Sequence, residues 1–144
     1  MERVKVNLPA NFNFSTHIKL RITDINYARH VGNDSFLSLI HEARVQFLNN
    51  FGYSESQVEN VSLIQSDAVI EFRKELNYGD QLKISVAATG FDKYGFDIFY
   101  KLEIINDGST VLCAKAKTGM LCYDYKNKKL IHVPEKAISI LSTA

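Results

Sequence analysis

One polar segment, residues 24 to 33, carries groups that could act on a carbonyl. It contains His30 and ends on Val31, Gly32 and Asn33, just before a stretch with the pattern of a helix. The first amides of a helix have no acceptor within the helix and lie at the positive end of its dipole. Such amides can hold the oxyanion that develops on an attacked carbonyl, and Gly32 would let that carbonyl approach closely. His30 can donate to the same oxygen or relay a proton.

Each of these residues also has a simpler interpretation. A histidine in a polar loop, such as His30, is usually solvated or structural. Asn33 is a residue type that commonly caps a helix. From residue types and spacing alone, a catalytic loop and an ordinary helix start both stay open.

The segment that follows the loop has the spacing of a buried helix. Apolar residues recur at helical intervals from Phe36 to Leu48, in a stripe too wide for an exposed helix. Asn33 or Asp34 suits the cap of the first turn, and Gly52 follows the end. We predict a helix from about Ser35 to Phe51.

The rest of the chain alternates in the manner of β-strands. One half-buried strand is predicted from His17 to Ile22, before the loop. After about Ser62 four more strand segments follow, and Asn106-Asp107-Gly108 is a hairpin signal between the last two. Pro134 then opens a short C-terminal helix. The four segments are residues 68–73, 82–86, 96–104 and 110–123.

This order of elements predicts an α+β fold in one domain, residues 1–144. A curved antiparallel sheet wrapped around the long central helix would bury the wide apolar stripe. Such a sheet leaves edge strands that need covering, so we expect the chain to pair with a second copy.

Composition excludes several classes of function. Charge is nearly balanced, with 17 Lys and Arg against 16 Asp and Glu, which argues against a nucleic-acid binder. No apolar run approaches the roughly 18 residues that a membrane span needs, and the first residues lack a secretory-signal pattern. Cys113 and Cys122 have no metal-site spacing and are expected to be buried, reduced thiols. We therefore expect a cytoplasmic protein without a metal site.

The loop and the helix carry a family resemblance. The run from Asp24 to Asn33, followed by Glu42-Ala43-Arg44, resembles the signature of the 4-hydroxybenzoyl-CoA thioesterase-like hotdog family. That family writes D-x-D-x-x-x-H-V-N-N, with E-A-R at the same distance downstream. The resemblance extends from about Ile18 to Pro134. It implies a hotdog fold and hydrolysis of acyl thioesters, with coenzyme A or phosphopantetheine entering as part of the substrate and no other cofactor.

The chain departs from this signature at the position of the acid. In much of the family the second acid of D-x-D is the catalytic carboxylate, and here that position is Asn26. An amide cannot ionise, so it can neither attack a carbonyl nor accept a proton from water. Glu75 is the leading replacement, since residues 72–75 resemble a segment with a functional Glu in plant acyl-carrier-protein thioesterases. Those enzymes share His30 but have Asp and Asn where this chain has Asn26 and Ala28, and Glu75 can equally be a paired carboxylate at a strand end.

Two further acids are secondary candidates. Asp24 matches the first acid of the signature and is expected to orient the loop through local hydrogen bonds. Glu42 is expected to pair with Arg44 or a partner residue, although related hotdog enzymes carry a catalytic acid on this helix.

The resemblance also implies an assembly. Hotdog enzymes typically place their site between two subunits, so we expect a homodimer or homotetramer with Glu75 acting across the interface. The acyl pocket is expected along the helix at Phe36 and Ile40. Arg29, Lys74 or the turn at residues 126–129 can supply cations for the coenzyme A phosphates.

Three functions stay open from the sequence. The first is a thioesterase for acyl-CoA or an acyl-carrier protein. The second is a hotdog enoyl-thioester hydratase or dehydratase, whose D-x-N-P-x-H pattern is missed by one residue, with Tyr27 in place of its proline. The third is an acyl-thioester binding protein without catalysis, suggested by Asn26.

Overall fold

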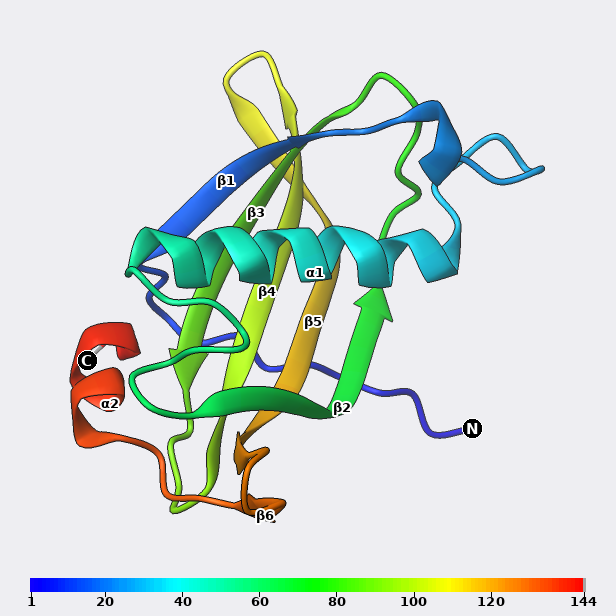
Figure 1. Ribbon diagram of the computed structural model, residues 1–144. Coiled ribbons are helices and arrows are strands. Elements are labelled where there is room, and N and C mark those ends of the chain that lie inside the picture. The colour runs from blue at the N-terminus through cyan, green and yellow to red at the C-terminus, as the bar shows by residue number, and fades with distance from the viewer. Residues whose placement is uncertain (144) are drawn as a thin grey trace.

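A long helix packed on one antiparallel sheet makes up most of the structure, a computed structural model that describes residues 1–143 (Figure 1). The helix α1 runs from Asn33 to Asn50 and follows a short 3-10 turn at Ile22–Asp24. The sheet has the strand order β1-β3-β4-β5-β2, and β6 pairs with β5. The strands are β1 (Phe14–Lys19), β2 (Ser62–Phe72), β3 (Gln81–Thr89), β4 (Gly95–Asn106), β5 (Ser109–Asp124) and β6 (Lys129–Leu130), and α2 spans Glu135–Leu141.

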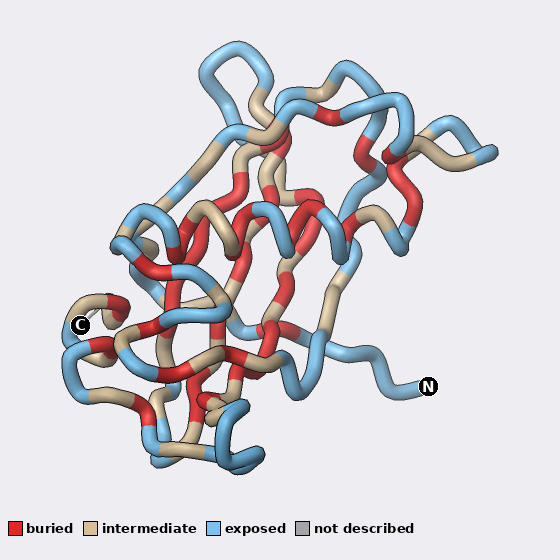
Figure 2. Tube along the Cα trace, in the orientation of Figure 1, coloured by how far each residue is buried: buried red, intermediate tan, exposed pale blue. Residues whose placement is uncertain are grey.

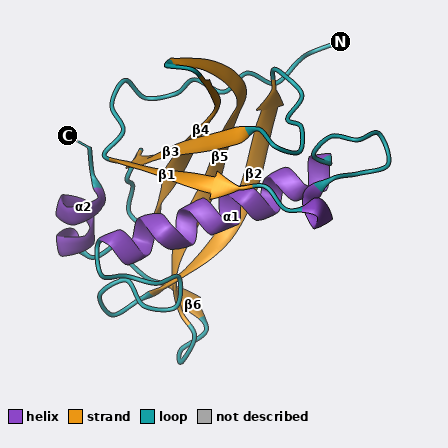
Figure 3. Cartoon of the chain, turned by 90° about the horizontal axis from the view of Figure 1, so that it is seen from above, coloured by secondary structure: helices purple, strands orange, loops and turns teal. Residues whose placement is uncertain are grey.

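The predicted α+β fold, a curved antiparallel sheet with one long helix on its inner face, is confirmed. All strand pairs are antiparallel, and α1 crosses one face of the sheet (Figure 3). The hairpin predicted at residues 106–108 joins β4 to β5, with Asp107 and Gly108 at positive φ. Pro134 caps the start of α2. No helix in residues 1–143 is both long and apolar enough to cross a membrane.

The core lies between α1 and the inner face of the sheet (Figure 2). Alternate residues of β4 point inward and are nearly inaccessible to solvent, as the strand period requires. Each fully buried large side chain contributes roughly 1.5–3 kcal/mol by leaving water. The facing sets are Phe36, Leu39, Ile40, Ala43, Phe47 and Leu48 on α1, and Phe96, Ile98, Tyr100, Leu102 and Ile104 on β4.

Several boundaries differ from the sequence prediction, and two of them flank the polar loop. Helix α1 begins at Asn33, two residues early, and its cap is Gly32 rather than Asn33 or Asp34. The carbonyl of Gly32 accepts hydrogen bonds from the amides of Ser35 and Phe36, and because glycine has no side chain the helix starts without a side-chain cap. The first strand ends at Lys19 because the 3-10 turn begins three residues later.

The two thiols are free and buried, as predicted. Burial raises the pKa of Cys113 to about 12 and that of Cys122 to about 11. Both groups are therefore protonated at neutral pH and poor nucleophiles.

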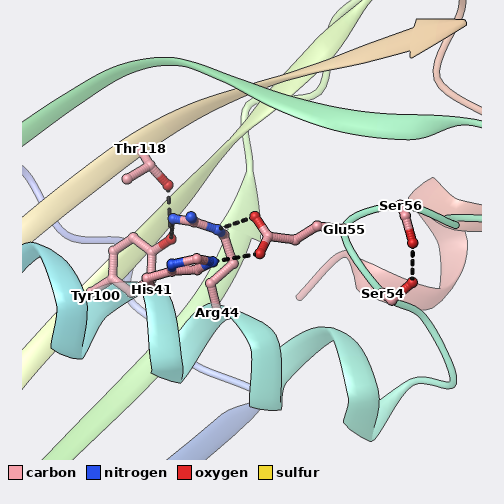
Figure 4. A network of polar contacts seen from close by, with 7 residues as sticks. All are labelled: His41, Arg44, Ser54, Glu55, Ser56, Tyr100 and Thr118. Atoms are coloured by element: carbon pink, nitrogen blue, oxygen red, sulfur yellow. Dashed lines mark hydrogen bonds and ion pairs between the residues drawn. The ribbon is translucent and has the colours of Figure 1, made fainter. Parts of the chain in front are cut away.

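A polar network crosses the core between α1 and the sheet (Figure 4). Arg44 donates from Nε to Glu55 Oε2 at 3.1 Å and from Nη1 to the Tyr100 hydroxyl at 3.2 Å. The Tyr100 hydroxyl also lies 2.7 Å from Thr118 Oγ1, and His41 Nε2 lies 2.7 Å from Glu55 Oε1. Burial acts to lower the Arg44 pKa, but its attraction to and hydrogen bonds with Tyr100 and Glu55 hold that pKa above its ordinary value.

The expected pair of Glu42 with Arg44 is wrong. Residues two apart on a helix point in nearly opposite directions, so Arg44 faces the core while Glu42 is exposed. Glu42 instead accepts a hydrogen bond from Gln46, one turn further along, at 2.9 Å.

Replacing Arg44 tests how much this network contributes to the free energy of unfolding. Arg44→Met keeps the apolar stem but leaves the Tyr100 hydroxyl and Glu55 without their cation, which should lower the free energy of unfolding by about 2–3 kcal/mol. Urea denaturation measures the change. The control is Arg73→Met, which breaks the exposed pair with Glu71 and should change stability little. Equal losses in the two variants would contradict a structural role for the buried network.

Candidate active site

The polar loop forms a small hairpin that projects beside the start of α1 (Figure 1). Ile25 and Val31 form an antiparallel bridge, and the amide of Asn26 donates to the carbonyl of His30 at 2.9 Å. The chain reverses between Asn26 and Arg29, whose φ of 70° lies in the left-handed region. The hairpin thereby fixes where its residues stand relative to the first turn of the helix.

The side chain of Asn26 is oriented within this hairpin. Its Oδ1 accepts a hydrogen bond from the amide of Ala28 at 2.9 Å. A Cβ added to Gly32 would lie 3.7 Å from Asn26 Nδ2, so the amide nitrogen stands next to the helix cap. With its oxygen engaged, Asn26 presents a hydrogen-bond donor at the helix start.

The backbone amides at the helix start divide into two groups. Val31 donates to the carbonyl of Leu76 at 2.7 Å, and Gly32 donates to the carbonyl of Asp24 at 3.2 Å. For the amide of Asn33 no acceptor exists among residues 1–143. The first free amide at the positive end of α1 is therefore that of Asn33.

His30 and Glu75 lie side by side. His30 Nε2 is 3.7 Å from Glu75 Oε1, and the side chains are 31% and 71% exposed. Backbone contacts hold the two segments together, since His30 bridges to Asn77 and Val31 bonds to Leu76. Glu75 lies beside His30 of its own chain, in the segment that follows β2. That Glu75 acts across a subunit interface stays a prediction.

A cavity of about 270 Å³ opens between these two segments. His30 and Glu75 line it together with Asn33, and Phe36 and Phe72 line it with apolar surface. The two phenyl rings meet edge to face, with centroids 5.1 Å apart. The arrangement places a carboxylate, an imidazole and a free helix amide around one space with an apolar wall.

Of the two residues expected to line the acyl pocket, only one lines this cavity. Phe36 does so, whereas Ile40 is 1% exposed and packed in the core. Phe72, which sequence reasoning assigned only to a strand, completes the aromatic wall. Alternation along residues 68–73 puts Phe72 on the same side as Ile70, and both pair with buried alanines of β5, which places Phe72 on the inner face.

The secondary acids lie elsewhere. Asp24 is 5% exposed and accepts a hydrogen bond from the amide of Arg21 at 2.8 Å, which agrees with a loop-orienting role. Asp24 and Glu42 both line a different cavity, between β1 and α1. Neither acid lines the cavity shared by His30 and Glu75.

The cations proposed to bind the coenzyme A phosphates lie at two ends of the molecule. Lys74 lines the same cavity as Glu75, and Arg29 lies on the exposed tip of the loop hairpin. The turn at residues 126–129 lies at the opposite end of the molecule, next to β6 (Figure 1). That turn cannot contact a ligand bound at the loop without a second chain.

The sequence as a whole matches a family model, described as the thioesterase-like superfamily, over residues 20–141. The chain belongs to the thioesterase-like superfamily. Among curated proteins no significant match exists. The matched residues include both the loop and the segment of Glu75, so the candidate site lies within the region that the family model matches.

Solved structures of thioesterases share the fold. An aspartate-to-asparagine variant of 4-hydroxybenzoyl-CoA thioesterase, complexed with 4-hydroxybenzoyl-CoA, has a TM-score of 0.79 at 17% identity and covers 90% of this chain and 98% of its own. A 1,4-dihydroxy-2-naphthoyl-CoA thioesterase from Synechocystis has a TM-score of 0.76 at 25% identity, covering 89% and 96%. A thioesterase from Thermus thermophilus, complexed with coenzyme A and Zn, has a TM-score of 0.76 at 17% identity, covering 91% and 98%.

Adding one methyl group at the helix cap should impair the site without unfolding it. The Cβ of Gly32→Ala would meet Asp34 Oδ1 at 2.6 Å, and this exposed side chain can rotate away. The methyl group would then crowd Asn26 Nδ2 and the approach to the Asn33 amide. We expect kcat/KM for thioester hydrolysis to fall about tenfold or more, with a melting temperature close to that of the parent. Asn50→Ala, at the other end of α1, is the control, and undiminished hydrolysis by Gly32→Ala would show that this surface does not receive the substrate.

Proposed function

We propose that this thioesterase-like chain hydrolyses acyl thioesters at the cavity shared by His30 and Glu75. Membership of the superfamily supports thioester hydrolysis in general. The observation that carries the proposal for this site is the His30–Glu75 contact at 3.7 Å, beside the free amide of Asn33. A base, a second proton carrier and an oxyanion donor are the groups that a hydrolase of this kind needs.

The carbonyl oxygen of the substrate is held at the helix start. The Asn33 amide and Asn26 Nδ2 donate to it, and the dipole of α1 favours the negative charge that develops there. Asn26 thus serves as a donor in place of the expected acid. The acyl group extends along the wall formed by Phe36 and Phe72.

Water is the nucleophile in this scheme. Glu75 accepts a proton from the water while the water oxygen bonds to the carbonyl carbon of the thioester. This addition forms a tetrahedral oxyanion. The carbon–sulfur bond then breaks, the carbonyl re-forms, and the sulfur leaves as a thiol after taking a proton from Glu75 or from His30. His30 stands next to Glu75 and to the helix start, so it can orient the water or carry this proton.

The thiol carrier is proposed to be coenzyme A or the phosphopantetheine of an acyl-carrier protein. Solved relatives with 4-hydroxybenzoyl-CoA or coenzyme A bound support the first carrier. Arg73 and Lys74 at the cavity, and Arg29 on the loop tip, are cations near the site that can contact its phosphates. We propose a cytoplasmic homodimer or homotetramer, in which a second copy supplies further contacts to the pantetheine arm.

A second candidate function is binding of an acyl thioester without turnover. Asn26 favours it, because the side chain that stands at the position of the family's catalytic acid cannot accept a proton. In that case Glu75 would serve only as the ion-pair partner of His30.

Replacing Glu75 separates the two functions. If Glu75 is the base, Glu75→Gln should lower kcat about 10²- to 10⁴-fold with little change in KM. Hydrolysis is measured with purified protein against acyl-CoAs of several chain lengths, and Glu135→Gln, an exposed acid on α2, is the matched control. Tight acyl-CoA binding without turnover by the parent, together with hydrolysis gained by Asn26→Asp, would overturn the proposal in favour of the binding protein.

A further inference from the structure

A second cavity lies on the seam between α1 and β2, further along the helix from the site. We call it the seam cavity; its volume is about 250 Å³. Four of its lining residues can donate hydrogen bonds, and no carboxylate lines it within residues 1–143. The lining residues are Leu37, Ser38, His41, Arg44 and Gln65.

Arg44 brings an incompletely paired guanidinium to this cavity. The residue is 5% exposed, and its Nε and Nη1 donate to Glu55 and Tyr100. Its Nη2 has no acceptor among residues 1–143. Every fully buried side-chain polar atom in that range is hydrogen-bonded, so Nη2 must reach accessible space. The seam cavity is lined by Arg44 and provides that space.

Arg44 and His41 are held in place by hydrogen bonds to residues that do not line the seam cavity. Glu55 engages Arg44 with one carboxylate oxygen and His41 with the other (Figure 4). The Tyr100 hydroxyl fixes the far side of the guanidinium and is itself bound to Thr118. Glu55 does not line the seam cavity, so the network turns donors rather than its carboxylate toward that space. Donors held rigidly in this way bind an acceptor with a small entropic cost.

The seam cavity lies along the same seam as the site. Phe36 of the site and Leu37 of the seam cavity are consecutive on α1. On β2 a bulge between Gln65 and Asp67 shifts the alternation by one residue, so that Gln65 and Phe72 share the inner face. With a rise of 1.5 Å per residue, the helical residues of the seam cavity lie about 6–17 Å beyond Asn33 along α1.

We infer that the seam cavity binds a carboxylate at the far end of the acyl chain. The inference rests on the proposed function, since it assumes that the thioester carbonyl lies at the start of α1. An acyl chain running along the seam from Phe36 and Phe72 reaches the donors of Ser38, His41, Arg44 and Gln65. The preferred substrates are then thioesters of medium-length dicarboxylic acids. The Arg44 guanidinium forms the charge-assisted hydrogen bond that selects them.

The direct test compares suberyl-CoA with octanoyl-CoA, two thioesters of the same chain length that differ by the terminal carboxylate. Both kcat/KM and the dissociation constant from calorimetry are measured on the full chain. We expect suberyl-CoA to be favoured about tenfold or more in both quantities. Equal values, or a preference for octanoyl-CoA, would overturn the inference.

A charge substitution in the cavity tests the same point within the protein. Gln65→Glu places a carboxylate beside Arg44, and it should abolish the preference for suberyl-CoA by repelling the substrate and occupying the guanidinium. Gln81→Glu at the start of β3 adds the same charge away from the seam cavity and should leave the preference intact. Loss of preference in both variants would attribute it to overall charge and overturn the inference.

Two outcomes separate this inference from the proposed function. If neither thioester is hydrolysed, hydrolysis is excluded for these substrates, yet tighter binding of suberyl-CoA still supports the carboxylate site. If 8-hydroxyoctanoyl-CoA is favoured as strongly as suberyl-CoA, the seam cavity recognises a neutral oxygen, and the assignment of an anion is wrong.

Discussion

The candidate site depends on one backbone contact, the hydrogen bond from the Val31 amide to the Leu76 carbonyl at 2.7 Å. Leu76 is fully buried, so this bond attaches the loop before α1 to the core through the segment that follows β2. His30 forms an antiparallel bridge with Asn77, and Glu75 lies two residues before Asn77 on the same side, so Glu75 is the diagonal neighbour of His30 and their side chains meet. The bond to Leu76 uses the Val31 amide and the Asp24 carbonyl takes the Gly32 amide, so the first free donor at the helix start is the amide of Asn33.

Helix α1 serves the site and the core with different faces. Its apolar face packs on the inner side of the sheet, and its first turn presents the positive end of the dipole to the loop. Arg44 interrupts the apolar face with a charge. A charge in such a place costs free energy unless it is paired and hydrogen-bonded, and Glu55 and Tyr100 supply that pairing. The seam between α1 and β2 therefore combines an apolar wall near the loop with fixed donors further along.

The sequence predicted the elements better than the contacts between them. Alternation and helical spacing are local, so the strands, the hairpin at residues 106–108 and the helix were found from residue types. The partner of Arg44 was not found, because Glu55 lies in the irregular segment after α1, and the sequence does not show where that segment folds back. The contact of Glu75 with His30 also depends on how β2 ends relative to the loop. Gly32 caps the helix through its carbonyl alone, and that leaves no side-chain signal.

In the proposed function the substrate carbonyl is held at the start of α1 by the Asn33 amide and Asn26. Isotope-edited infrared spectroscopy of octanoyl-CoA labelled with ¹³C at the carbonyl, bound to the slow Glu75→Gln variant, tests it directly. We expect a carbonyl band at lower frequency than in water, which moves back toward the solution value when Asn26→Leu is added. A bound carbonyl at the solution frequency, unchanged by Asn26→Leu, would contradict it.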